Sequence, residues 1–115
     1  MYASIGIIGG MGPAATCDLM QKIIDNTAAP DDQHHIHLYV DCNTAIPDRT
    51  AAILRGGADP LPELRRSAEK LRAMGADLII MPCNTAHYFH GACAAGGYPA
   101  PRPAPRGNSG RCCRA

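Results

Sequence analysis

Three short apolar segments alternate with stretches of helical periodicity in the first ninety residues of the chain. Each apolar segment runs into a loop that contains Gly or Pro, which is typical of buried strands. The predicted strands are SIGIIG at 4–9, HIHLYVD at 35–41 and DLIIMP at 77–82. Apolar residues recur every three or four positions between them, which predicts amphipathic helices at about 13–27 and 61–74. A shorter helix is predicted at 48–54, and another begins at Asn84 or Thr85.

This alternation predicts an α/β fold, a three-layer lobe in which a parallel sheet carries helices on both faces. Right-handed crossovers would connect the parallel strands. Ligands of such folds gather at the edge where strands end and helices begin. The loops at 9–13, 41–49 and 82–85 share that edge, so functional residues are expected there.

Composition limits the kind of partner. The 115 residues fit one domain, and their formal net charge of +1 gives no electrostatic case for nucleic acid or an anionic membrane. A small-molecule partner is therefore expected. The cysteines have no C-x-x-C spacing, and no signal core or membrane-length apolar run is present, which favours reduced thiols in a soluble, cytoplasmic protein.

The composition changes after His90. Residues 91–115 are rich in Gly, Ala, Pro and Arg and contain no acid, Lys, Leu, Ile, Val or Met. Such a segment cannot form a core face. We therefore expect one domain at 1–90, followed at 91–115 by a disordered tail or the product of a shifted reading frame.

The first loop permits three interpretations. Gly10, Gly12 and Ala15 satisfy G-x-G-x-x-A between a strand and a helix, and Asp41 ends the second strand where a dinucleotide fold has its ribose-binding acid. The glycines could instead only allow a tight turn. We favour a third interpretation, in which the amides at the helix N-terminus hold a carboxylate or another small anion.

The second loop contributes one candidate cation and one candidate cap. Arg49 has a planar guanidinium that can grip a carboxylate with two hydrogen bonds, although a loop Arg is often only a solvated surface residue. Asp48 is better explained as the N-cap of the short helix than as a catalytic group.

Cys83 is the candidate reactive residue of the third loop. An ordinary thiol has a pKa of about 8.5, and a position at a helix N-terminus can lower it. Asn84 and Thr85 could bind an anion, and His87 could face the thiol across one helical turn. An inert, buried cysteine explains the same residue equally well.

The remaining thiols and the histidines carry weaker signals. Cys17 is expected to pack at the edge of a helix, and Cys42 lies beside the site without neighbours that would activate it. The last three cysteines, Cys93, Cys112 and Cys113, belong to the unusual tail. Metal binding by the crowded histidines His34, His35 and His37 is conceivable, but exposed histidines are the preferred interpretation, so no metal site is predicted.

Three motifs together resemble one known family. IGIIGGMGP at 5–13, NTAIPDRT at 43–50 and MPCNTAH at 81–87 are similar to the N-terminal signatures of the cofactor-independent aspartate/glutamate racemases, and of the aspartate racemase branch in particular. The resemblance covers residues 4–90. Members of that family have two similar α/β lobes with the active site between them, and each lobe provides one cysteine.

The resemblance implies a role for each candidate. Cys83 would be one of two acid/base thiols that move the α-proton of an amino acid without pyridoxal phosphate, metal or any other cofactor. Arg49 would grip the substrate carboxylate, and Met11, Gly12, Asn84 and Thr85 would bind the amino acid. The second lobe and its cysteine have no counterpart in this sequence, which implies a truncated racemase.

Two other functions stay open at this stage, an inactive amino-acid-binding lobe or fragment and a dinucleotide-binding module. A nucleotide domain has no need of the Cys83 thiol, which counts against the second. Aspartate is the expected substrate, but the sequence does not distinguish it from glutamate or a wider set of amino acids. An exposed lobe interface could also make the chain a homo-oligomer.

Overall fold

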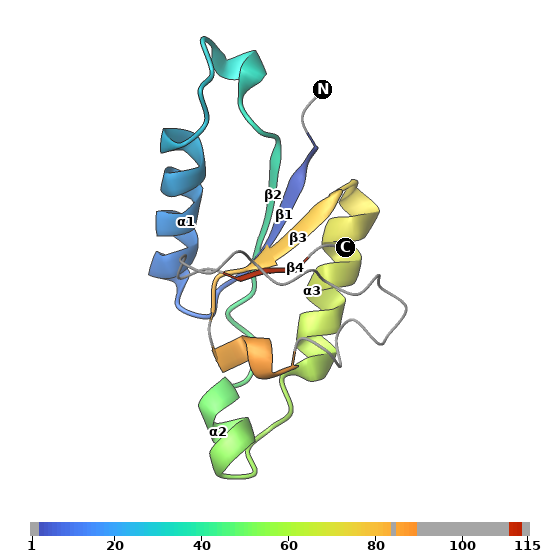
Figure 1. Cartoon of the computed structure of the whole chain (residues 1–115). Coiled ribbons are helices and arrows are strands. Elements are labelled where there is room, and N and C mark those ends of the chain that lie inside the picture. Colours follow the sequence, from blue (N-terminus) through green and yellow to red (C-terminus); the bar gives the residue numbers. More distant parts are fainter. Residues whose placement is uncertain (1–2, 84, 90–110, 114–115) are drawn as a thin grey trace.

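The computed structural model describes residues 3–83, 85–89 and 111–113, and its elements follow the predicted order (Figure 1). Strands alternate with helices from the first strand to the third. The elements are β1 Ile5–Gly9, α1 Pro13–Asp25, the 3-10 helix η1 Asp32–His34, β2 Leu38–Cys42, α2 Arg49–Leu54, α3 Leu61–Met74, β3 Leu78–Met81, the 3-10 helix η2 Thr85–Phe89 and β4 Arg111–Cys113.

The strands form one sheet in the order β2-β1-β3-β4. β1 lies in the centre of the first three and pairs in parallel with both neighbours, so that Ile5 is opposite Leu38 on one side and Leu78 on the other. β4 adds an antiparallel strand beside β3. The predicted α/β lobe with a parallel three-stranded sheet is therefore confirmed.

Two glycines of β1 show that helices cover both faces of the sheet. A Cβ on Gly6 would lie 2.9 Å from Cβ of Ala76 and 3.1 Å from Cβ of Leu71, on the α3 side. A Cβ on Gly9 would lie 2.5 Å from the side chain of Thr16 in α1. Side chains three positions apart on a strand point to opposite faces. Accordingly, α1 and α3 flank the sheet from opposite sides, as Figure 1 shows.

The core lies mainly between the sheet and α3. The helix contributes the buried residues Leu64, Ser67, Ala68 and Leu71, and the sheet contributes Ile8, Ile79 and Met81 to the same cluster. Met74 belongs to the predicted apolar stripe of α3 but is 56% exposed. Leu71 packs against Gly6, near the start of β1. Met74 lies one helical turn beyond Leu71, where the sheet no longer covers the helix.

α1 is packed less deeply than its sequence pattern predicted. Thr16 is its buried residue, and Ile24 is 44% exposed. Cys17, which was expected to pack at the edge of the apolar stripe, is exposed, and that prediction is wrong. Thr16 is the α1 side chain that contacts β1. Successive side chains on a helix point about 100° apart, so Cys17 is turned away from the sheet.

The second strand begins later than predicted. Residues 35–37 were assigned to it, but β1 begins at Ile5, whose partner in the register is Leu38. The Ile5 N–H also donates to the His37 carbonyl oxygen at 3.0 Å, at the start of the pairing. Of the segment 91–115, residues 111–113 form β4 and the others lie outside the described residues. Within the part of the chain that the structure describes, no helix is long and apolar enough to cross a membrane.

Candidate active site

The three loops predicted to share one edge are brought together by the parallel register. Gly9 at the end of β1 lies opposite Cys42 at the end of β2, and β3 ends beside them at Met81. The apolar cluster continues into this edge, because it includes Met11, Ile46 and Ala86, with Cys83 packed against it. Each of the three loops therefore anchors one side chain in a common core.

The first loop is shaped by two glycines with positive φ. Gly10 has φ 91°, and Gly12, with φ 73°, precedes Pro13 at the first position of α1. Met11 is 6% exposed, and its side chain packs in the core. Gly12 is exposed. The predicted Pro13 start of the helix is confirmed.

The dinucleotide interpretation depends on Asp41. This residue lies opposite Ile8 in the sheet, on the face covered by α3. Its carboxylate oxygen Oδ2 is buried and has no hydrogen-bond partner among the described residues. An acid that binds the hydroxyls of a ribose must present its oxygens to the ligand, whereas one oxygen of Asp41 is closed off beneath the helix layer.

Arg49 is the first residue of α2, and its guanidinium folds back along its own loop. Nη1 donates hydrogen bonds to the carbonyl oxygens of Pro47 at 3.2 Å and Ile46 at 3.4 Å. Nε is buried and has no acceptor in the described part of the chain. The side chain is half-buried and therefore differs from an ordinary solvated surface arginine.

Asp48 caps α2, as predicted. Its Oδ1 accepts hydrogen bonds from the backbone N–H of Thr50 at 2.9 Å and of Ala51 at 3.1 Å. The bond from Ala51 is the main cause that lowers the pKa of this carboxyl below its ordinary value of 3.8, although desolvation opposes it. Asp48 thus fixes the start of the helix that carries Arg49.

Cys83 has a free, half-buried thiol and follows Pro82, the first residue after β3. The helix that follows is the five-residue 3-10 helix η2, which begins at Thr85 and contacts α2. So short an element aligns fewer peptide dipoles than the predicted α-helix would. Thr85 is exposed. Asn84 and the side chain of His87 lie outside the described residues.

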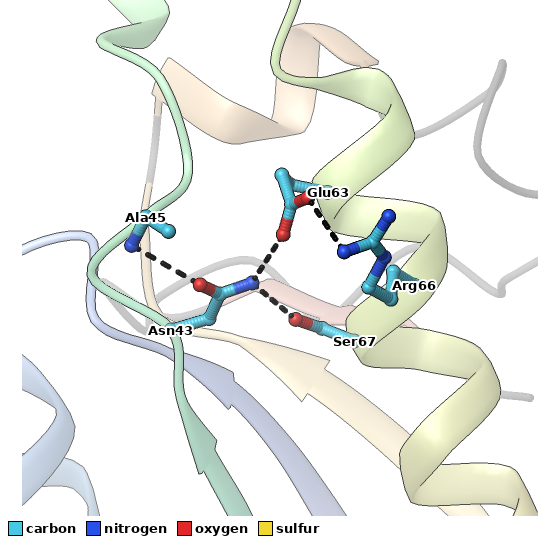
Figure 2. A network of polar contacts seen from close by, with 5 residues as sticks. All are labelled: Asn43, Ala45, Glu63, Arg66 and Ser67. Atoms are coloured by element: carbon cyan, nitrogen blue, oxygen red, sulfur yellow. Dashed lines mark hydrogen bonds and ion pairs between the residues drawn. The ribbon is translucent and has the colours of Figure 1, made fainter.

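Asn43, which was not among the predicted site residues, links the loop after β2 to α3 (Figure 2). Its Nδ2 donates to Oγ of Ser67 at 3.0 Å and to Oε2 of Glu63 at 3.1 Å, and its Oδ1 accepts from the Ala45 N–H at 3.1 Å. An Asn directly after a strand is a signal for the local turn at Ala45. Its partners on α3 lie 20 and 24 positions away in sequence, and no local pattern indicates them.

Cys42 and the histidines, for which no direct role was predicted, lie away from the Cys83 side of the sheet or make other contacts. Cys42 is exposed and lies opposite Gly9, which faces α1, whereas Cys83 packs on the α3 side. His34 pairs with Asp31, and the ring of His37 stacks on Tyr39 with centroids 4.4 Å apart. Among the residues that the structure describes, no group of His, Cys, Asp and Glu could hold a metal ion.

Comparisons with known proteins agree with this geometry. The broad specificity amino-acid racemase RacX of Bacillus subtilis (strain 168) is 31% identical, in a match that covers 75% of this chain and 39% of that protein. The solved structure of Picrophilus torridus aspartate racemase superposes with a TM-score of 0.72 at 36% identity, covering 76% of this chain and 38% of that one. The chain therefore spans less than half the length of either relative.

The family comparison extends over most of the chain. Residues 8–100 match the model of the Asp/Glu/hydantoin racemase family. That match includes the loops that carry Met11, Arg49 and Cys83 and the whole of α3. The chain belongs to the Asp/Glu/hydantoin racemase family.

Proposed function

We propose that this chain carries the proton-exchanging thiol of an amino-acid racemase, with aspartate as its substrate and no cofactor. The observation that carries the proposal is the half-buried Cys83 thiol at the strand edge where the loops of Met11 and Arg49 also end. Family membership supports the reaction class. The aspartate racemase of similar fold supports the substrate.

The proposed chemistry is a reversible proton transfer. The Cys83 thiolate takes the α-proton of the amino acid, the C–H electron pair stays on the α-carbon, and the resulting thiol returns a proton to that carbon. Arg49 would hold the substrate carboxylate with its guanidinium, which lies on the loop that leads into α2 at this edge of the sheet. The backbone of Met11 and Gly12, with Asn84 and Thr85, would bind the rest of the amino acid.

Inversion of the α-carbon needs a proton donor on the opposite face of the carbanion. Besides Cys83, the cysteines whose side chains the structure describes are Cys17 and Cys42, and both are associated with the α1 side of the sheet. They cannot be the opposing donor within this lobe. We therefore propose proton exchange at Cys83, for which one thiol suffices, as the activity of this chain.

The test is deuterium incorporation. The purified full chain is incubated with L-aspartate in heavy water, and loss of the α-proton signal is followed by NMR. Cys83→Ser should slow the exchange by about 100-fold or more, because it removes the acid/base group. Cys42→Ser is the matched control and should leave the rate within about two-fold, since this thiol is exposed on the other face.

Each outcome distinguishes the proposal from its alternatives. Unchanged exchange in Cys83→Ser would contradict the role of the thiol. Binding of aspartate without any exchange would favour an inactive amino-acid-binding lobe. Binding of NAD without affinity for aspartate or glutamate would favour the dinucleotide-binding alternative.

A further inference from the structure

Asn43 makes four hydrogen bonds to three different parts of the fold. Its backbone N–H donates to the Gly9 carbonyl at 3.0 Å. Its side chain accepts from Ala45 and donates to Ser67 and Glu63 (Figure 2). The residue therefore connects the end of β1, the loop before α2, and α3.

The hydrogen bonds of Asn43 lie in a closely packed part of the fold. Ser67 is 0% exposed, and Asn43 itself is half-buried, so water cannot easily replace a lost hydrogen bond. A Cβ on Gly10 would lie 2.4 Å from the carbonyl carbon of Asn43, so the two loops are in close backbone contact. A shift of Asn43 would have to move the first loop as well.

Arg49 depends on the segment that Asn43 fixes. The turn at Ala45 leads directly into Ile46, which is 5% exposed in the core. The carbonyl oxygens of Ile46 and Pro47 then accept the hydrogen bonds from Nη1 of Arg49. The position of the guanidinium is thus set by the backbone that starts at Asn43.

We propose that Asn43 is a positioning residue, which holds the Arg49 guanidinium where it receives the carboxylate of the substrate. The inference rests on the proposed racemase function for its substrate, but the coupling between Asn43 and Arg49 can be measured without it. Asn43 acts through Arg49. It leaves the Cys83 loop, which follows a different strand, in place.

The test exchanges the hydrogen-bond donor and acceptor between the side chains of Asn43 and Glu63. Asn43→Asp keeps the shape and the acceptor for Ala45, and Ser67 can rotate its hydroxyl to donate. The new carboxylate then faces the carboxylate of Glu63, and this repulsion should displace the loop. Adding Glu63→Gln supplies an amide donor and should restore the contact. Glu63→Gln alone is the control, since its amide oxygen can still accept from Asn43.

Two measurements on the full chain report the result. In deuterium exchange of L-aspartate, Asn43→Asp should raise KM by about ten-fold or more while kcat changes little, and the double variant should recover most of the loss. In NMR, solvent exchange of the buried Arg49 Nε–H should accelerate in Asn43→Asp and slow again in the double variant, with core amides such as that of Ile7 unaffected.

The outcomes separate this inference from the proposed function. If the wild-type chain shows no exchange of aspartate, the proposed function fails and the Nε–H measurement alone decides the coupling. Unchanged KM with an unchanged Nε–H signal would overturn the inference. A fall in kcat at constant KM would overturn it too, because the influence of Asn43 would then reach Cys83 and not Arg49.

Discussion

The backbone N–H of Gly10 donates a hydrogen bond of 3.1 Å to Oγ1 of Thr16. Thr16 is 3% exposed, and a Cβ on the preceding Gly9 would collide with its side chain. The hydroxyl thus satisfies a backbone donor in the tight turn between β1 and α1. One α1 side chain therefore both covers the end of the central strand and fixes the first loop of the site.

Thr16→Val should destabilise the chain by about 1–3 kcal/mol, because the shape is kept while the Gly10 N–H loses its acceptor. Chemical denaturation would measure the free energy of unfolding. Thr50→Val is the matched control, since Thr50 is an exposed helical residue, and it should change stability by less than about 0.5 kcal/mol. Equal effects at the two positions would show that the Thr16 hydroxyl adds nothing specific.

Two glycines with positive φ allow steric conflict to be separated from backbone strain. Gly56→Ala, at φ 63° with nothing within 4 Å of the new Cβ, should cost about 1–2 kcal/mol of unfolding free energy from the left-handed conformation alone. Gly10→Ala, at φ 91°, should cost about 1–3 kcal/mol more, because its Cβ meets the Asn43 backbone. Comparable losses in the two variants would contradict the close contact between the loops.

Asp48 should titrate below 3.8 in the folded chain, because the ionised carboxylate accepts hydrogen bonds from Ala51 and Thr50. A lowered folded-state pKa gives stability that is present above the unfolded value and is lost as the pH falls through the folded value. The stability advantage over Asp48→Asn should therefore be full at neutral pH and shrink below 3.8. Carboxyl NMR would give the pKa directly, and a value above 3.8 would refute the assignment.

Arg49→Lys tests the proposed carboxylate contact. Lysine keeps the charge but loses the planar fork, so KM for aspartate in deuterium exchange should rise by about ten-fold. Arg55→Lys is the control, because Arg55 is exposed at the other end of α2 and should leave KM unchanged. Equal KM values for Arg49→Lys and the wild type would place the substrate carboxylate elsewhere.

The local elements of the fold could be predicted because their signals are local. Pro13 begins α1, Asp48 caps α2, and Gly75, with φ 110°, ends α3, all as the residue types indicate. The start of β2 was misplaced because a strand can begin only where its partner does, and β1 begins at Ile5, which pairs with Leu38. Cys17 was misplaced because an apolar stripe shows which face can pack, but not how deeply.

The sequence by itself determined the order of strands and helices and the edge at which the candidate residues gather. Periodicity, caps and turn residues act over a few positions, and parallel strands must end on the same side. Only the tertiary structure decided that Asn43 reaches Ser67 and Glu63, that one Asp41 oxygen is buried, and that Arg49 folds onto its own loop. The contacts of Asn43 and the burial of Asp41 depend on how α3 lies across the sheet, and this is set by packing between distant segments that no local pattern encodes.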